Sequence, residues 1–258
     1  MSKKSSGIVI IYKNKLENCL SFIQSESQFV QWVKISNVAF DIILGCVYVP
    51  PEGSKYSNSE SFDEIEKELI ALSKDSNMYS AIVGDFNAKI GTLNDFIIPD
   101  ETLLDLFYLD SDNDVLSYML DYENLENQGV PLSRVSQCSC QPNNYGFKLL
   151  NLCKKLNICI ANSRIGLDKG IGKRTCKNTS VIDYFMMSSK LFSLVKEFEI
   201  QDFDPLLADV HNPIHITLQS SVTPNINNSN TSQHRTKTQW FDNKRMSLSI
   251  QFTTVKVC

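Results

Sequence analysis

The stretch Ile82-Val83-Gly84-Asp85-Phe86-Asn87 decides how the rest of the chain is interpreted. The apolar run 81–83 predicts a short buried strand, which ends at a glycine. Asp85 and Asn87 follow two residues apart, a spacing that can place both side chains on the same side of the chain. A carboxylate can accept a proton and a carboxamide can donate hydrogen bonds to an anion. Taken alone, these residues also fit a polar turn in which Asp85 caps backbone groups.

Three further stretches accompany this one in order. They are Cys46-Val47-Tyr48-Val49-Pro50-Pro51, Ser180-Val181-Ile182-Asp183-Tyr184 and Ala208-Asp209-Val210-His211-Asn212-Pro213-Ile214. In this order and with these gaps, the set resembles the endonuclease/exonuclease/phosphatase superfamily. It looks most like the apurinic-type endonuclease domain at the front of LINE-like (non-LTR) retrotransposon polyproteins, and the segment 145–184 fits that subfamily. The resemblance runs from about Gly7 to Leu218.

The resemblance implies roles for the matched residues. In the family, the aspartate of the Gly-Asp-Phe-Asn motif orients or deprotonates the attacking water, which implies that role for Asp85. The asparagine contacts the scissile phosphate, which implies that role for Asn87. The aspartate of the Ser-x-x-Asp-Tyr motif holds a histidine, so we expect Asp183 to hold His211 and raise its basicity. The alternative for His211 is a histidine on a surface loop.

Two other matches and the cofactor follow from the same resemblance. Tyr48 matches a strand-end tyrosine that reaches the phosphate, although a tyrosine packed within its strand is the alternative. Asn162 matches a polar strand-end residue that lines the cleft. The family uses a divalent metal, so the resemblance implies Mg²⁺ or Mn²⁺ as the cofactor and DNA as the partner. It implies neither a membrane nor a small-molecule cofactor, and the oligomeric state stays open.

The chain departs from the family pattern near its last motif. Val210 is inserted between Asp209, the expected metal ligand, and His211. A strict strand would turn one of these two residues to the other face, whereas a bulge could restore both. A second departure is Pro51, which stands where the pattern often has an asparagine.

The largest departure concerns the start of the chain. The family begins with a strand that carries an asparagine, followed by a glutamate that ligates the metal, and neither has a match here. Glu17, Glu26 and Glu52 are not in the matching context. We therefore expect an endonuclease domain that is truncated at its N-terminus and lacks its first strands. A non-catalytic remnant that binds nucleic acid weakly, or a phosphatase of the same superfamily acting on small phosphoesters, are the alternatives.

Composition limits where DNA could bind. The 258 residues are 42% hydrophobic and 21% charged, which is typical of a globular protein, and the net charge is −4. A nucleic-acid contact therefore needs a local basic patch. Residues 164–178 form such a loop, in which Lys173 and Arg174 are candidate substrate-binding residues, although a solvated surface loop is an equal alternative. Its basic residues are Arg164, Lys169, Lys173, Arg174 and Lys177.

Hydrophobic periodicity predicts an α/β fold. Helices are expected at 57–75, begun by a capping box of Ser61 and Glu64, and at 144–156. We expect a four-layer α/β sandwich, with two packed β-sheets flanked by helices, over residues 1–218, and a disordered linker and tail over 219–258. Between 92 and 127 a solvated acidic face with short helices is favoured over a metal cluster. Strands are expected at 7–12, 19–23, 29–35, 38–48, 158–160, 181–187 and 213–218, and in the apolar run that ends at Gly84. Residues 191–198 are expected to form either a short helix or a strand.

Eight cysteines occur in a chain without a predicted signal peptide. We interpret them as free thiols of an intracellular protein, nuclear if it acts on genomic DNA. Cys138-Ser139-Cys140 has no second pair at zinc-finger spacing, so a zinc site is disfavoured.

Overall fold

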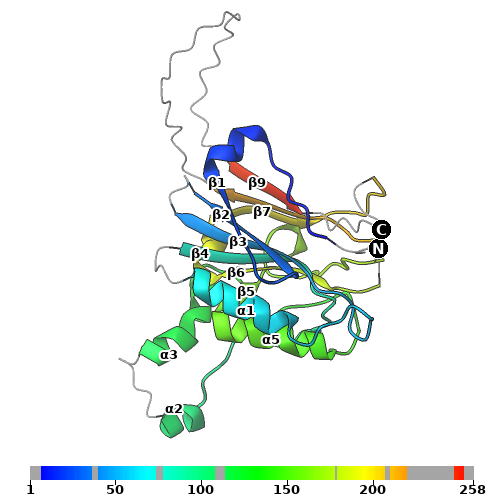
Figure 1. Ribbon diagram of the computed structural model, residues 1–258. Coiled ribbons are helices and arrows are strands. Elements are labelled where there is room, and N and C mark those ends of the chain that lie inside the picture. The colour runs from blue at the N-terminus through cyan, green and yellow to red at the C-terminus, as the bar shows by residue number, and fades with distance from the viewer. Residues whose placement is uncertain are drawn as a thin grey trace, which may run out of the picture.

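The computed structural model describes residues 7–36, 40–73, 78–107, 114–177, 179–206, 210–219 and 247–252. Within these ranges the chain forms a six-stranded sheet, a three-stranded sheet and several helices (Figure 1). None of the described helices is long and apolar enough to cross a membrane.

The larger sheet contains the strands that lead to the candidate residues. Its spatial order is β1-β2-β3-β4-β6-β5; β3 and β4 run parallel, and the other neighbouring pairs are antiparallel. A parallel pair needs a crossover connection, which here contains helix α1 (Ser61–Leu72). The strands are β1 (Leu20–Ile23), β2 (Val30–Ile35), β3 (Asp41–Tyr48), β4 (Met78–Asp85), β5 (Ile158–Ile160) and β6 (Asp183–Ser188).

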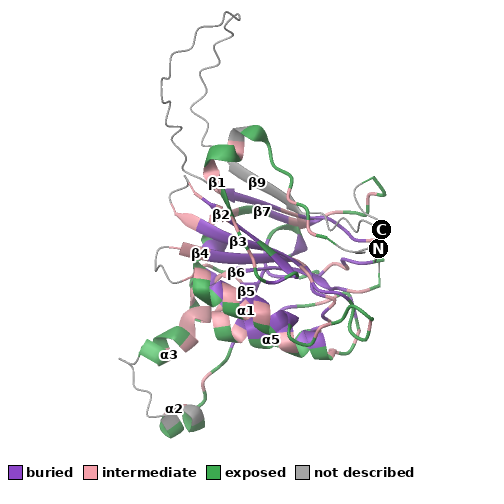
Figure 2. Cartoon of the chain, in the orientation of Figure 1, coloured by how far each residue is buried: buried purple, intermediate pink, exposed green. Residues whose placement is uncertain are grey.

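Helices α1 and α5 (Asn144–Leu156) lie side by side on one face of the larger sheet (Figure 1). Along α1, Phe62, Ile65 and Leu69 recur at helical spacing and are buried. They belong to one apolar core with residues of both helices and of strands β2 to β4. Figure 2 shows this buried surface in purple between the helices and the sheet.

A three-stranded sheet contributes to a second apolar core together with the larger sheet. It consists of β7 (Val195–Ile200), β8 (Ile214–Gln219) and β9 (Ser247–Phe252), in the order β7-β8-β9. Along β8, Ile214, Ile216 and Leu218 join this core, which also contains residues of β3, β4 and β6. The prediction of two packed β-sheets flanked by helices is confirmed.

Several predicted elements form where the pattern placed them. Helix α5 has the predicted bounds, and the predicted strands at 19–23, 29–35 and 158–160 form with small differences at their ends. The acidic stretch from 92 to 127 yields short helices, as expected. The remaining elements are α2 (Glu101–Phe107), α3 (Asp114–Met119), α4 (Glu123–Asn127) and the 3₁₀ helices η1 (Asn14–Cys19), η2 (Leu120–Tyr122), η3 (Gly166–Asp168) and η4 (Ser189–Leu194).

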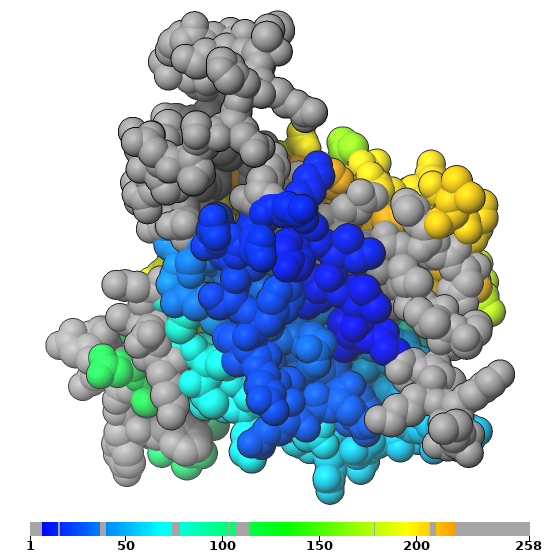
Figure 3. Space-filling view, turned by 45° about the horizontal axis from the view of Figure 1, so that its top comes forward, coloured from blue at the N-terminus to red at the C-terminus, as the bar shows by residue number. Residues whose placement is uncertain are grey.

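The predicted strand at 7–12 does not form. Ile8 and Ile10 pack against the second core, whereas the side chains of Val9 and Ile11 are 67% and 89% exposed. The segment lies on the molecular surface, where Figure 3 shows it in the darkest blue. A β-branched run favours an extended backbone, but a strand also needs a neighbour for its backbone hydrogen bonds.

The predicted capping box of α1 is also wrong. The residue before the helix, Glu60, makes no side-chain cap, and the hydroxyl of Ser61 donates to the carbonyl of Asn58. The carboxylate of Glu64 instead accepts a hydrogen bond from Ser27, a residue 37 positions earlier in the chain. The Glu64 carboxylate thus makes a tertiary contact in place of the local capping hydrogen bond.

The end of the chain differs from the predicted boundary at residue 218. Residues 247–252 form β9, which pairs antiparallel with β8 from Ile214↔Phe252 to Gln219↔Ser247. The strand at 213–218 is therefore not the last one. The predicted disordered linker and tail at 219–258 lie outside the described residues, apart from residue 219 and residues 247–252.

A buried ion pair joins the acidic stretch to the loops beside the sheet. Arg164 and Asp95 are both 1% exposed, and the guanidinium donates to both carboxylate oxygens of Asp95 at 2.6 and 2.7 Å. Asp95 also accepts from the backbone N–H of Ile160, and Arg134 lies 3.7 Å away. These cations hold the pKa of Asp95 below its ordinary value although burial opposes this. Asp95 is thus an exception to the solvated acidic face.

Removing one partner of this pair tests its importance. We expect Asp95→Ala to lower the free energy of unfolding by about 3–5 kcal/mol, because it leaves Arg164 buried without a counter-charge. The exposed Asp105 of α2 provides a control, and Asp105→Ala should change stability by less than about 0.5 kcal/mol. Urea unfolding followed by circular dichroism measures both, and equal effects of the two substitutions would contradict the prediction.

Candidate functional site

Three of the predicted site residues meet at one edge of the larger sheet. Asp85 is the last residue of β4, and Asp183 is the first residue of β6. The two strands are antiparallel neighbours and place these residues directly opposite each other. Tyr48 ends β3 and pairs with Asp85 from the other side. The order of the strands therefore brings together residues that are far apart in the chain, since Tyr48 and Asp183 are 135 positions apart.

A glycine is required where β4 approaches β3. Gly84 has φ +147°, and a Cβ atom there would lie 1.9 Å from the backbone oxygen of Val47. Any side chain would force the two strands apart. The glycine of the opening motif thus permits the close strand pairing that aligns Asp85 with Tyr48.

His211 faces this group of residues. Its ring Nδ1 lies 3.0 Å from each carboxylate oxygen of Asp183, and its Nε2 lies 3.8 Å from Oδ2 of Asp85. Since a carboxylate accepts hydrogen bonds, Nδ1 donates and Nε2 is turned toward Asp85. The contact between Asp183 and His211 that the resemblance implies is present. Of the two residues around the inserted Val210, His211 faces the site, and Asp209 lies outside the described residues.

Thr175 connects three segments of the site, and sequence reasoning missed it. Its buried hydroxyl accepts from the backbone N–H groups of Ile182 and Asp183, both at 3.0 Å. Its carbonyl accepts from the backbone N–H of Asn212, next to His211. Thr175 therefore holds the chain on both sides of the Asp183–His211 pair. Its signal in the sequence is only a threonine within a basic loop.

The electrostatics of the site centre on Asp85. Burial and then the charge of Asp183 raise the pKa of Asp85 to about 8, whereas His211 and hydrogen bonds from Asn87 act in the opposite direction. Asp85 is 3% exposed, so little solvent reaches its carboxylate. A carboxyl group whose pKa lies near neutrality can exchange protons under physiological conditions.

Asn87 is oriented by contacts inside the protein. Its backbone N–H donates to Oδ1 of Asp85 at 2.9 Å, and its side-chain Nδ2 donates to Oδ2 of Asp85 and to the carbonyl of Val49. The two contacts of Nδ2 measure 3.1 and 2.8 Å and use both of its hydrogens. A contact from this amide N–H to a phosphate, as the resemblance implies, would have to replace one of these bonds.

Asn162 lines a small pocket beside the site and also makes structural hydrogen bonds. It is 2% exposed; its Nδ2 donates to the carbonyl of Asp183, and its Oδ1 accepts from the backbone N–H of Phe185. Both contacts hold the start of β6. Such contacts are expected where a polar side chain is buried at the end of a strand.

The basic loop divides into buried and exposed residues. Arg164 belongs to the buried pair with Asp95, so its predicted availability for DNA is wrong. The ammonium group of Lys173 lies 2.7 Å from Oδ1 of the exposed Asp202. Arg174 is half-buried, and its Nε atom is buried without a hydrogen-bond partner among the described residues. Lys169 and Lys177 are exposed.

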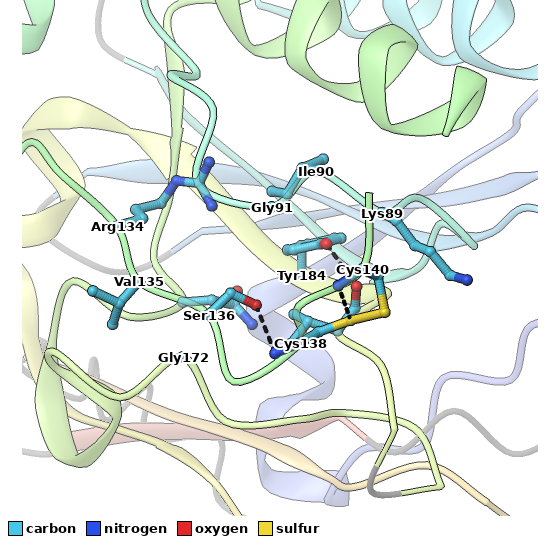
Figure 4. Close-up of a pocket in the computed structure, with 12 residues that line it drawn as sticks. Lys89, Ile90, Gly91, Arg134, Val135, Ser136, Cys138, Cys140, Gly172 and Tyr184 are labelled. Atoms are coloured by element: carbon cyan, nitrogen blue, oxygen red, sulfur yellow. Dashed lines mark hydrogen bonds between the residues drawn. A yellow bond between two sulfur atoms is a disulfide. The ribbon is translucent and has the colours of Figure 1, made fainter. Parts of the chain in front are cut away.

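A small pocket lies beside the site (Figure 4). Its volume of about 10 Å³ corresponds to the space of roughly one water molecule. A disulfide between Cys138 and Cys140 forms part of its wall, so the prediction of free thiols is wrong for these two residues. Their spacing of two residues brings the sulfur atoms within bonding reach. The other cysteines in the described part of the chain are free: Cys19, Cys46, Cys153, Cys159 and Cys176.

The described residues contain a donor set that fits a divalent cation. Asp85, Asp183 and His211 each offer a ligand atom, and these atoms lie within 4.8 Å of one another. Two carboxylates and an imidazole are common ligands of Mn²⁺, and carboxylates also suit Mg²⁺. The two neighbouring carboxylates, which raise the energy of the ionised site, would be stabilised by such a cation.

Comparisons with solved structures give several neighbours, two of which follow. The endonuclease domain of TRAS1, a telomere-specific non-LTR retrotransposon, is 16% identical with a TM-score of 0.43; the match covers 75% of this chain and 64% of that chain. The inositol polyphosphate 5-phosphatase domain of SPsynaptojanin, solved with inositol (1,4)-bisphosphate and calcium, is 11% identical with a TM-score of 0.31, covering 77% and 55%.

By their names, one of these neighbours is an endonuclease domain and the other is a phosphatase domain. This chain spans less than two thirds of the length of either neighbour. No protein-family model and no curated protein matches the sequence.

The raised pKa of Asp85 predicts how stability depends on pH. The pKa is about 8 in the folded protein against an ordinary value of 3.8. Between these values the unfolded chain binds fewer protons, so the free energy of unfolding of the metal-free protein should fall as pH rises from about 4 to about 8.

Asp85→Asn keeps a neutral group at this position and should remove that fall. We expect the variant to be more stable than the natural protein at pH 8, by on the order of a few kcal/mol, and the difference to shrink toward pH 4. Thermal unfolding in the presence of a chelator, repeated across this pH range, measures the effect. Parallel curves for the two proteins would show that Asp85 ionises normally.

Proposed function

We propose that this chain is a metal-dependent phosphodiesterase domain that nicks DNA, of the type found in LINE-like retrotransposons. The observation that carries the proposal is the buried cluster of Asp85, Asp183 and His211, in which one histidine lies between two carboxylates. Hydrolysis of a phosphodiester needs an activated water and stabilisation of the charge that develops on the phosphate. The cluster provides a group for each requirement.

In this proposal Asp85 orients and deprotonates the attacking water. Its carboxylate is held by both the backbone and the side-chain N–H groups of Asn87, so its direction is fixed before a substrate binds. Its pKa of about 8 makes it a stronger base than an ordinary aspartate once it is ionised.

His211 contacts the phosphate through its Nε2 atom. Asp183 accepts from Nδ1, which fixes the tautomer and the ring orientation and stabilises the charged imidazolium. The charged ring can then donate to a phosphate oxygen. Tyr48, at the end of β3 and in register with Asp85, supplies a hydroxyl for the same phosphate.

The residues that would hold Mg²⁺ or Mn²⁺ are the carboxylates of Asp85 and Asp183, with Asp209 proposed from the sequence as a further ligand. When bound, the cation supplies positive charge for the phosphate oxygens and lowers the pKa of a coordinated water. We expect the basic loop, through Lys173 and Arg174, to contact the DNA backbone, with action in the nucleus if the target is genomic.

A plasmid-nicking assay tests the proposal. The purified chain should convert supercoiled plasmid to the open circle with Mg²⁺ or Mn²⁺ and should lose this activity with a chelator. Asp85→Asn should lower the nicking rate by at least about a hundredfold, because removal of a general base typically costs about 10²–10⁴ in rate.

Retention of nicking by Asp85→Asn would assign the activity to another group or to a contaminating nuclease. A folded protein that nicks no plasmid with either metal would favour the non-catalytic remnant. Release of phosphate from small phosphoesters without nicking would favour the phosphatase alternative.

Arg174 allows a separate test of DNA contact. Since Arg174 lies in the basic loop and is partly exposed, we expect its guanidinium to bind a phosphate. Arg174→Ala should weaken binding and reduce the slope of log K against log salt by about 0.9, the value for one phosphate contact. Fluorescence anisotropy with a labelled duplex measures this slope.

Lys190→Ala is the matched control. Lys190 is exposed in η4, which follows β6 at the end away from Asp183. The substitution removes the same charge and should leave the slope unchanged. Equal slopes for Arg174→Ala and Lys190→Ala would remove Arg174 from the proposed DNA contact.

A further inference from the structure

The residue before helix α5, Asn143, is bonded to the turn that carries Asn87. Its side-chain Oδ1 accepts from the backbone N–H of Gly146, as a helix cap does, and also from the backbone N–H of Lys89, both at 2.8 Å. Its Nδ2 donates to the carbonyl of Asn87 at 3.1 Å. Its own backbone N–H donates to the carbonyl of Lys89. Three of these four bonds go to residues 87–89.

The close approach of the helix to this turn depends on Gly146. A Cβ atom at this position would lie 1.8 Å from the carbonyl oxygen of Lys89, which is a backbone atom and cannot rotate away. The first turn of α5 and the segment after β4 are therefore in direct contact. The two segments in contact are more than 50 residues apart in the chain, and the spacing within the motif at 82–87 does not predict their contact.

The turn has a left-handed backbone conformation at Asn87. Asn87 has φ +48°, in the left-handed region that residues with a side chain adopt at a cost. In this conformation its backbone N–H and its side-chain Nδ2 both reach the carboxylate of Asp85. The bond from Asn143 to the carbonyl of Asn87 holds the peptide group that follows this residue.

We propose that Asn143 is a positioning residue of the site: its Nδ2 holds the backbone of Asn87 so that Asn87 directs the carboxylate of Asp85. The inference rests on the proposed function, in which Asp85 and Asn87 act on a phosphodiester. Asn143 acts on the cluster through the peptide group of Asn87, to whose carbonyl its Nδ2 donates. The competing interpretation is a helix cap with no effect on the site.

Asn143→Asp separates the two interpretations. Aspartate caps helices as well as asparagine does, and a negative charge at a helix N-terminus is favourable, so α5 and its cap should be retained. The carboxylate still accepts from Gly146 and Lys89, but it cannot donate, and it places an oxygen against the carbonyl of Asn87. The change therefore removes the one bond that the proposal needs.

Two further variants complete the design. Asn143→Ser keeps a residue that caps helices well. Its shorter side chain, with one hydroxyl group, cannot make the hydrogen bonds to Gly146, Lys89 and Asn87 at the same time. It also keeps the test available if Asn143→Asp should fail to fold. Asn144→Asp is the matched control, because it adds the same charge at an exposed neighbouring position whose amide contacts Glu52 and not the turn.

The measurements are steady-state nicking with Mg²⁺, thermal unfolding, and the side-chain amide resonance of Asn87 in ¹H–¹⁵N spectra. For Asn143→Asp and Asn143→Ser we expect kcat to fall about tenfold with little change in KM, the scale of one lost hydrogen bond. The melting temperature should stay within a few degrees, and the Asn87 resonance should move. Asn144→Asp should leave kcat, KM and the Asn87 resonance unchanged, and the loss of its exposed bond to Glu52 should lower the melting temperature by no more than a few degrees.

Unchanged kcat and an unmoved Asn87 resonance in folded Asn143→Asp would overturn the proposal and leave a helix cap. A fall in kcat that follows the melting temperature, with the resonance unmoved, would do the same. If the natural protein nicks no DNA, the proposed function fails, but the resonance of Asn87 still shows whether Asn143 positions it.

Discussion

Two carboxylates, those of Asp85 and Asp183, lie directly opposite each other on neighbouring strands and are both almost fully buried. Two ionised groups so placed repel each other where water cannot screen them, and this repulsion contributes to the raised pKa of Asp85. The other residues of the site offset this repulsion between the two carboxylates. His211 lies between the two groups, and Asn87 donates twice to Asp85.

The compensation requires a rigid surrounding, since a hydrogen bond helps a buried charge only while its geometry is kept. The two apolar cores lie on opposite faces of the larger sheet and fix the strands that end at the site. Gly84 lets β3 and β4 approach, Thr175 holds the chain before Asp183, and Asn143 connects α5 to the turn after β4. Each support comes from a different layer of the fold.

The sequence predicted those features that depend on local patterns. Helix α5 has a regular apolar face and was expected at its observed bounds, and the strand that ends in Gly84-Asp85 follows from a short apolar run. The contact of Asp183 with His211 followed from a motif resemblance. Contacts between distant segments had no such signal. Thr175 and Asn143 are a polar loop residue and a helix cap by pattern, and only the fold brings them to the site.

The wrong predictions have the same origin. Arg164 lies in a basic loop by sequence, but Asp95, 69 residues earlier, makes it a buried residue. Residues 7–12 have the composition of a strand and lack a strand neighbour in the described part of the chain. Strand β9 forms in a tail whose composition favoured disorder, because β8 offers it a backbone edge to pair with. In each case a tertiary partner, present or absent, overrode the local preference.

The charges of the cluster also limit what it can bind. With Asp85 and Asp183 ionised and His211 protonated, the three side chains carry two negative charges and one positive charge, a net of −1. A phosphodiester adds another negative charge, so an encounter with the ionised cluster is unfavourable unless positive charge accompanies it. The half-buried guanidinium of Arg174 is one source, and a divalent cation at the carboxylates is a stronger one. A proton on Asp85 would also relieve the repulsion, but it would remove the base. Because a cation would neutralise the site and keep Asp85 ionised, the proposed hydrolysis would be better supported with a bound cation than by the side chains alone.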